Sequence, residues 1–149
     1  MKDAPDSPAE LRARALRLLA RREHSRSELR RKLSVRAETS AALELLFSDL
    51  EKQKQLSEAR YAEERARVLA RKFGAARIRR DLKAKGVAPE LIDRVSSAGE
   101  LERARAILER KYRQPAATRE ERAKRMRFLQ GRGFSFDIIR SLLSSRGEG

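Results

Sequence analysis

Residues 85–92 read Lys-Gly-Val-Ala-Pro-Glu-Leu-Ile, and residues 132–139 read Arg-Gly-Phe-Ser-Phe-Asp-Ile-Ile. The second stretch repeats the order of residue types in the first 47 positions later (133 − 86), except that Phe136 replaces Pro89. Glycine often ends a helix because it adopts positive φ with little steric strain, and proline is well tolerated in the first turn of the next helix. Such a spacing is typical of a tandem array of helical modules, whose function belongs to an extended surface.

The repeat extends to three modules of three helices each. Residues 105–112 match residues 66–73 at an offset of 39 (112 − 73), and aligning Leu33 with Leu82 adds the first module. Ala, Leu, Arg and Glu are abundant and β-branched residues are few, so we expect an all-α fold. The predicted order is a flexible leader over 1–8, three-helix repeats over 9–54, 55–98 and 99–145, and a frayed tail over 146–149.

Capping residues and glycines mark the helix boundaries. Capping boxes are predicted at Ser25-x-x-Glu28 and Thr118-x-x-Glu121, a serine cap at Ser57, and helix ends near Phe73-Gly74 and at Gly86. In a capping box, the hydroxyl oxygen and the carboxylate satisfy amides left free at a helix start. The helix that Pro89 opens is expected to run to Val95, and its module to end near Ser97.

The few aromatic residues mostly serve the core in this prediction. Phe47, Phe73, Tyr112 and Phe134 fall on apolar helical stripes, whereas Tyr61, Phe128 and Phe136 are less clearly buried. Stacking of nucleic-acid bases requires exposed aromatic rings. Base-specific recognition is therefore weakly supported, whereas phosphate contacts are easily supplied by cations.

The chain is strongly basic, since 37 Lys and Arg residues against 22 Asp and Glu give a formal net charge of +15. Such a field attracts polyanions or an acidic protein surface, although arginine also fills solvated helix faces because of its helix propensity. The absence of cysteine excludes disulfides and thiolate metal sites and fits a reducing cytoplasm, where we expect the protein. No run of about 18 apolar residues exists, and the leader lacks the apolar core of a signal peptide.

Signs of an enzyme are nearly absent, so we expect no catalysis, no cofactor and no metal. The one histidine, His24, lies at a predicted helix end, where a cation near the C-terminus is its ordinary role. The adjacent carboxylates of Glu63-Glu64 and Glu120-Glu121 lie in first helical turns, where negative charge is favoured. Sequence neighbours point to different helix faces and therefore make poor acid–base or metal pairs.

The basic residues of residues 75–85 are more informative. Arg79, Arg80 and Lys83 cluster opposite Ile78 and Leu82, and no acid shares their stripe because successive side chains are about 100° apart. This pattern favours a binding role. The third module carries Lys124 and Arg127 on a comparable arc, while Arg67 and Arg71 continue a basic stripe that Glu63 and Glu64 could neutralise.

Three segments resemble the RecX family of regulatory proteins, and the resemblance covers nearly the whole chain, from about Leu11 to Leu143. The segments are Leu-Ser-Glu-Ala-Arg-Tyr-Ala over 56–62, Phe-Gly-Ala-Ala-Arg-Ile-Arg-Arg-Asp-Leu-Lys-Ala-Lys-Gly-Val over 73–87, and Phe-Leu-Gln-Gly-Arg-Gly-Phe-Ser over 128–135. Their order and spacing together make the resemblance specific. Two departures are Ser57-Glu58, where the family usually has an acidic pair, and Gly131, where a polar or basic residue is common.

The resemblance implies an elongated, curved array that binds in the groove of the RecA–DNA filament. It implies a negative regulator of the RecA recombinase, which inhibits filament extension, ATP hydrolysis, strand exchange and the co-protease activity in the damage response. The family offers no catalytic residues to carry over. Recurrent basic positions of the family match Arg60, Arg77, Lys85 and Arg132, although helix capping competes with contact at Lys85 and Arg132.

We therefore expect the partner to be the RecA filament, with DNA phosphates as a further contact, single- or double-stranded, no membrane, and a monomeric chain. The alternative is a nucleic-acid-binding protein that acts alone through helix-turn-helix units such as residues 75–95. Its recognition helix would be short and would carry only Arg94 as a base-reading cation. A structural basic protein would rest on charge alone.

Overall fold

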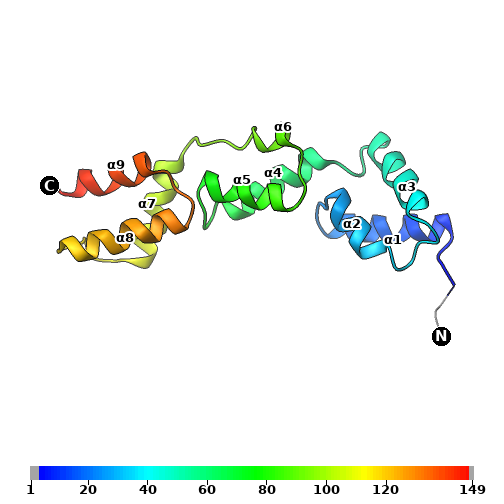
Figure 1. Cartoon of the computed structure of the whole chain (residues 1–149), viewed down its shortest axis with the longest axis horizontal. Coiled ribbons are helices and arrows are strands. Elements are labelled where there is room, and N and C mark those ends of the chain that lie inside the picture. Colours follow the sequence, from blue (N-terminus) through cyan, green and yellow to red (C-terminus); the bar gives the residue numbers. More distant parts are fainter. Residues whose placement is uncertain (1–3, 148–149) are drawn as a thin grey trace. The chain divides into compact units, whose positions relative to one another are not determined.

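A computed structural model describes residues 4–147, with side chains through Ser144. Over this range the chain forms nine α-helices and no strand, which confirms the predicted all-α fold (Figure 1). The helices are α1 (Pro8–Arg21), α2 (Arg26–Leu33), α3 (Ser40–Lys52), α4 (Glu58–Leu69), α5 (Ala75–Ala84), α6 (Pro89–Ile92), α7 (Glu100–Lys111), α8 (Arg119–Gly131) and α9 (Phe136–Gly147). Residues 1–3 of the predicted leader and residues 148–149 of the predicted tail lie outside the described part.

Contact density divides the chain into two compact units. Unit 1 contains the described residues up to Glu64 together with Lys85–Val87, and unit 2 contains Arg65–Ala84 and the described residues from Ala88 onward. The three repeats are defined by sequence rather than by compactness, so their boundaries stay a prediction.

The core of unit 1 is built by α1, α2 and α3. Its buried members are Leu11, Ala15, Leu29, Leu33, Leu43, Phe47, Leu50 and Leu56, each at most 3% exposed. Burial of such side chains contributes about 1.5–3 kcal/mol each. The residue Asp6 joins this unit, because its amide donates to the carbonyl of Arg36 and its carboxylate pairs with Arg14.

The core of unit 2 lies mainly among α7, α8 and α9, which pack against one another (Figure 1). Its buried members are Ala104, Ile107, Leu108, Leu129, Phe134, Ile139, Leu142 and Leu143. Ala75, Ile78 and Leu82 are buried on α5 as the helical period predicts. Phe47 and Phe134 are core residues as predicted, whereas Phe73 and Tyr112 are only half-buried.

The predicted helix starts are confirmed. Ser25 and Glu28 form a complete capping box at α2, and Ser57 accepts from the amide of Arg60 at the start of α4. Thr118 caps α8 by accepting from the amide of Glu121 at 3.1 Å. The Glu121 carboxylate, however, accepts from the amide of Ala117 rather than from Thr118, one residue earlier than a standard box.

Two predicted helix ends were too late. The α4 helix ends at Leu69 rather than near Phe73, and α6 ends at Ile92 rather than at Val95. Beyond α6, the amides of Arg94 and Val95 donate to carbonyls three residues earlier, as in a turn, and the carbonyl of Val95 accepts a hydrogen bond from Arg79. A helical wheel carries no information about such a tertiary bond.

The paired glycines behave as predicted, with φ of 79° at Gly86 and 91° at Gly133. The structure adds a contact that the sequence does not reveal. The amide of Gly74 donates to the carbonyl of Arg132 at 2.7 Å, and a Cβ at Gly74 would lie 2.5 Å from the carbonyl oxygen of Gly133. A Cβ at Gly133 would lie 2.4 Å from the Cβ of Arg77. The start of α5 and the α8–α9 turn therefore meet backbone to backbone.

A second pattern links successive modules through long-range caps. The Glu58 carboxylate at the start of α4 accepts from the amide of Arg26 at the start of α2, at 2.6 Å. In the same way, the Glu100 carboxylate at the start of α7 accepts from the amide of Ala75 at the start of α5, also at 2.6 Å. Helix N-termini leave amides unsatisfied, so an acid from the next module completes each helix.

Candidate interaction surface

The helix α5 presents its cations to solvent because its other face is buried. Arg80 and Lys83 are exposed and make no hydrogen bond or ion pair within the described residues. Arg79 is half-buried, and its Nη2 donates to the carbonyl of Val95 at 2.9 Å. Of the three cations predicted on this stripe, two are thus free for a partner and one braces the segment after α6.

A groove between α5 and α8 brings predicted residues of two repeats together. It is lined by Arg77, Arg80, Asp81, Arg127, Gln130 and Gly131. Its one lining acid, Asp81, already accepts two hydrogen bonds from Arg65, at 2.9 and 3.1 Å. The groove therefore keeps a positive potential, which favours anionic groups.

One wall of this groove is fixed by Arg77. Its Nη1 donates to the carbonyl of Gly131 at 2.9 Å, and its guanidinium lies 4.2 Å from the centroid of the Phe73 ring. Lys124, predicted on the same face of α8 as Arg127, is exposed and makes no such contact within the described part of the chain. The two helices thus carry one cation, Arg77, that internal contacts fix in place, and another, Lys124, whose side chain makes no such contact.

Arg67 and Arg71 line a second groove, between α4 and α7. The other lining residues are Ala70, Arg103, Ala106, Ile107, Glu109 and Arg110. Arg110 donates to the carbonyl of Arg71 at 2.8 Å, so the backbone after α4 is held to α7. Within the described residues, the predicted neutralising acids Glu63 and Glu64 form no ion pair with Arg67 or Arg71, and both cations remain exposed.

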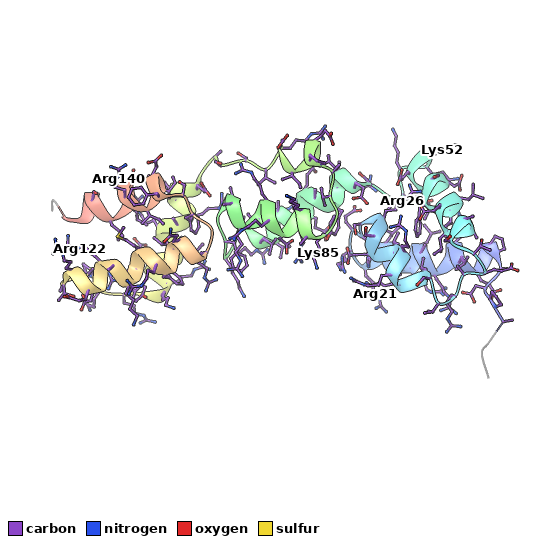
Figure 2. The ribbon with its side chains drawn as sticks, in the orientation of Figure 1. Arg21, Arg26, Lys52, Lys85, Arg122 and Arg140 are labelled. Atoms are coloured by element: carbon purple, nitrogen blue, oxygen red, sulfur yellow. The ribbon has the colours of Figure 1, made fainter. Side chains whose placement is uncertain are left out.

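The remaining predicted site residues differ in how much of their side chain is free. Arg60 is engaged in unit 1, since it donates to Glu23 and to the carbonyl of Lys54, both at 2.8 Å. Arg132 donates to the carbonyl of Lys72 at 3.4 Å, so part of its role is to hold the chain after α4. Lys85 follows the end of α5, exposed and without a partner in the described residues (Figure 2).

A row of alternating cations and aromatic rings in unit 2 escaped the sequence reasoning. Guanidinium or ammonium groups lie 4.2–5.9 Å from the ring centroids of Phe73, Tyr112 and Phe128; the cations are Arg77, Lys111, Arg125 and Arg132. Such contacts hold a cation in place without removing its charge. The helical stripes assigned Phe73 and Tyr112 to the core and left Phe128 ambiguous, whereas all three rings are half-buried, which leaves a face of each for a cation.

Unit 1 contains a basic groove that the sequence analysis also missed. It is lined by Arg14, Arg17, Leu18, Arg21, Lys32, Leu33, Val35 and Arg36. The spacing of Arg14, Arg17 and Arg21 along α1 was the available signal, because residues three and four apart share a helix face. Val35 is 84% exposed beside these cations.

The histidine prediction was wrong in its charge state. His24 is 2% exposed, its Nδ1 lies 3.0 Å from the carbonyl oxygen of Arg22, and its Nε2 lies 2.9 Å from the ammonium of Lys32. Burial lowers the pKa of His24, the bond to the Arg22 carbonyl opposes this, and the charges of Arg22 and Lys32 lower it further. The ring is therefore neutral, donating through Nδ1 and accepting through Nε2.

Within residues 4–147, no three His, Asp or Glu side chains are grouped so that they could hold a metal ion. In the same part of the chain, every helix is too short or too polar to cross a bilayer. The notable chemistry of this surface is its positive charge.

Comparisons with known proteins agree on one family. The models of the second and third three-helix domains of RecX match residues 57–95 and 98–143. The regulatory protein RecX of Leptothrix cholodnii is 45% identical over 136 residues, covering 89% of this chain and 87% of that protein. The regulatory protein RecX of Herbaspirillum seropedicae is 44% identical over 139 residues, with coverage of 91% and 90%.

A solved structure supports the fold. The crystal structure of RecX from Lactobacillus salivarius superposes with a TM-score of 0.80 and covers 95% of this chain and 97% of that one. The sequence identity of that pair is 19%, so this likeness concerns the arrangement of helices alone.

Proposed function

Since this chain belongs to the RecX family of regulatory proteins, we propose that it is a negative regulator of the RecA recombinase in the cytoplasm. It binds in the groove of the RecA–DNA filament and inhibits filament extension, ATP hydrolysis, strand exchange and co-protease activity. It acts as a monomer. It needs no cofactor, because a regulator that works by occupying a surface catalyses no reaction.

The observation that carries this proposal beyond family membership is the groove between α5 and α8. Arg77, Arg80 and Arg127 line it, and its acid Asp81 is already paired with Arg65. A groove with unneutralised cations attracts the acidic side chains or phosphates of a filament, and this attraction falls as salt rises. Such a surface suits an elongated partner better than a small molecule.

The helix-turn-helix alternative has less support. Its recognition helix would be α6, which spans only Pro89–Ile92 and places Arg94 beyond its end. A recognition helix reads bases by laying several side chains into the major groove, which a single turn cannot do. A stand-alone sequence reader is therefore the weaker candidate.

The deciding measurement is single-stranded-DNA-dependent ATP hydrolysis by the cognate RecA, with this protein added well below one copy per RecA. We expect strong inhibition at such ratios, because one bound chain stops the growth of a filament of many subunits. Unchanged hydrolysis, together with salt-sensitive binding of DNA by the chain alone, would favour the stand-alone alternative.

A triple variant tests the groove. Replacing Arg80, Lys83 and Arg127 with alanine should raise the concentration needed for half-inhibition, while the helical circular dichroism stays unchanged because all three side chains are exposed. Arg79 is left in place because it holds the carbonyl of Val95. The matched control removes the same charge elsewhere in unit 2, by alanine at Arg94, Arg113 and Arg122. Equal loss in both triples would mean that net charge alone drives inhibition.

A further inference from the structure

One buried leucine aligns the middle helices of the three repeats. Leu33 on α2, Leu82 on α5 and Leu129 on α8 are 3%, 0% and 0% exposed. Two residues before each of them, the chain has an arginine: Arg31, Arg80 and Arg127. The repeats therefore place the same cation at the same position relative to the core.

The positions on either side of this arginine are used inside the fold. Three residues before the leucine, Arg30 pairs with Glu44 at 2.7 Å and Arg79 donates to the carbonyl of Val95 at 2.9 Å. In the third repeat this position is Met126, which packs against the core of unit 2. The residue type at this position has diverged, and every copy has an internal role.

The position immediately before the leucine behaves in the same way. Lys32 contacts the Nε2 of His24 at 2.9 Å, and Asp81 pairs with Arg65 at 2.9 Å. In the third repeat, the ring of Phe128 meets that of Tyr112 edge to face at 6.0 Å. A base, an acid and an aromatic residue thus serve three different internal contacts.

By contrast, the arginine between these positions is exposed in every repeat, and its side chain makes no hydrogen bond, ion pair or ring contact within the described residues. No packing requirement accounts for its identity at Arg31, Arg80 and Arg127. A residue that stays the same while both of its neighbours diverge, and that contacts nothing inside, is suited to an external partner.

We propose that Arg31, Arg80 and Arg127 each contact a phosphate of one nucleic-acid strand, one contact per repeat. The planar guanidinium matches two phosphate oxygens at once. Phosphates recur about every 3.4 Å along a strand, so each arginine finds one whatever the spacing between repeats.

This inference rests on the proposed function in one respect only, since the RecA filament would supply the strand in the cell. Its test therefore omits RecA. Binding of a labelled 30-nucleotide oligothymidylate and of a 30-base-pair duplex is followed by fluorescence anisotropy over a series of NaCl concentrations. Each arginine-to-alanine change should lower the slope of log K against log salt by about 0.7 for the single strand and about 0.9 for the duplex.

Matched controls remove the same charge outside the aligned position. Lys52 in unit 1 and Arg122 on α8 are exposed and make no side-chain contact within the described part of the chain (Figure 2). Lys52→Ala and Arg122→Ala should leave the salt slope unchanged. Arg31→Lys should retain the wild-type slope, because the slope counts neutralised phosphates, but it should bind more weakly because an ammonium lacks the two-pronged fit. The triple variant of the aligned arginines should lose about 2 from the single-strand slope.

Three outcomes would overturn the inference. Equal slope changes in the controls would show diffuse electrostatic binding. A normal slope for Arg31→Ala, with reduced slopes for Arg80→Ala and Arg127→Ala, would confine the contacts to unit 2. Unchanged DNA binding, with weaker capture of DNA-free RecA, would identify an acidic protein surface as the partner. If the DNA-binding test contradicts the arginine contacts, the proposed inhibition of RecA is unaffected. If the chain does not inhibit RecA, the DNA-binding result is unaffected in the same way.

Discussion

Within the described residues, arginines form seven ion pairs with carboxylates in unit 1 and three in unit 2, where many arginines are instead held by backbone carbonyls and aromatic rings. The ion pairs of unit 1 are Arg12–Asp49, Arg14–Asp6, Arg22–Glu28, Arg26–Glu44, Arg26–Glu51, Arg30–Glu44 and Arg60–Glu23. In unit 2, carbonyl oxygens accept from Arg77, Arg79, Arg110 and Arg132. A carbonyl or a ring orients a cation without cancelling its charge. Unit 2 is thus ordered and still strongly positive, which suits a surface that must bind anions.

The largest expected effect tests how far unit 2 depends on its backbone contacts. Gly133→Ala should lower the free energy of unfolding by about 3 kcal/mol, because the new Cβ meets the Cβ of Arg77 and the backbone has positive φ. Thermal unfolding followed by circular dichroism measures the loss. Gly131→Ala is the control, since a Cβ there meets nothing within 4 Å, and it should be neutral or stabilising by up to about 1 kcal/mol. Equal effects of the two changes would contradict the close contact.

The second prediction concerns acids that bond the backbone instead of a cation. Glu100→Ala should cost about 2 kcal/mol, because it leaves the buried amide of Ala75 without its acceptor. Glu58→Ala in unit 1 should cost about 1 kcal/mol, since Ser25 still caps α2. Urea unfolding of both variants provides the measurement. A larger loss for Glu58→Ala would reverse the comparison between the units.

The third prediction concerns the pH dependence of unit 1. Burial would raise the pKa of Glu28, but Arg22 and the Ser25 amide outweigh it and hold this pKa at about 2. A depressed pKa contributes stability that is present above the unfolded value near 4.5 and lost as pH falls toward 2. Glu28→Gln should therefore cost about 1.5 kcal/mol at pH 7, after allowance for solvent screening, and only about 0.3 kcal/mol at pH 2, where the folded carboxyl is half protonated. Unfolding curves between pH 2 and 7 measure this, and a cost independent of pH would count against the ion pair.

The smallest expected effect separates the two ways of holding arginine by their response to salt. Arg30→Gln removes a half-exposed pair with Glu44 and should cost about 0.5 kcal/mol at low ionic strength and nothing in 1 M NaCl. Arg77→Met in unit 2 should cost about 1 kcal/mol in both conditions, because its partners are a carbonyl and the Phe73 ring. If the Arg77→Met cost vanished in salt, the proposed difference between the units would be wrong.

Local features of this fold could be predicted from the sequence because their causes are local. The caps at Ser25, Ser57 and Thr118 and the positive φ of Gly86 and Gly133 depend on residues within a few positions of each other. The apolar faces of α2, α5 and α8 follow from the helical period alone.

Long-range features could not be predicted because they join residues far apart in sequence. Arg77 was expected only as a recurrent basic position of the family, and its bond to the carbonyl of Gly131, 54 residues away, left no trace in local spacing. Tyr61 is 3% exposed although its stripe was ambiguous, while Phe136 is 58% exposed with Arg140 over its ring. The candidate surface was foreseen on α5 and α8, but the groove that joins them depends on packing that no stripe encodes.

The long-range caps have a consequence for synthesis on the ribosome, where the chain emerges from its N-terminus. The amide of Ala75 has no local side-chain acceptor and must wait for Glu100, made 25 residues later (100 − 75). The α2 helix has a local cap in Ser25 besides Glu58, and α8 has one in Thr118. At about 5–20 residues per second, the middle helix of the chain therefore stays incomplete for a second or more after it is made. Its basic face becomes fixed only when the following repeat begins to appear.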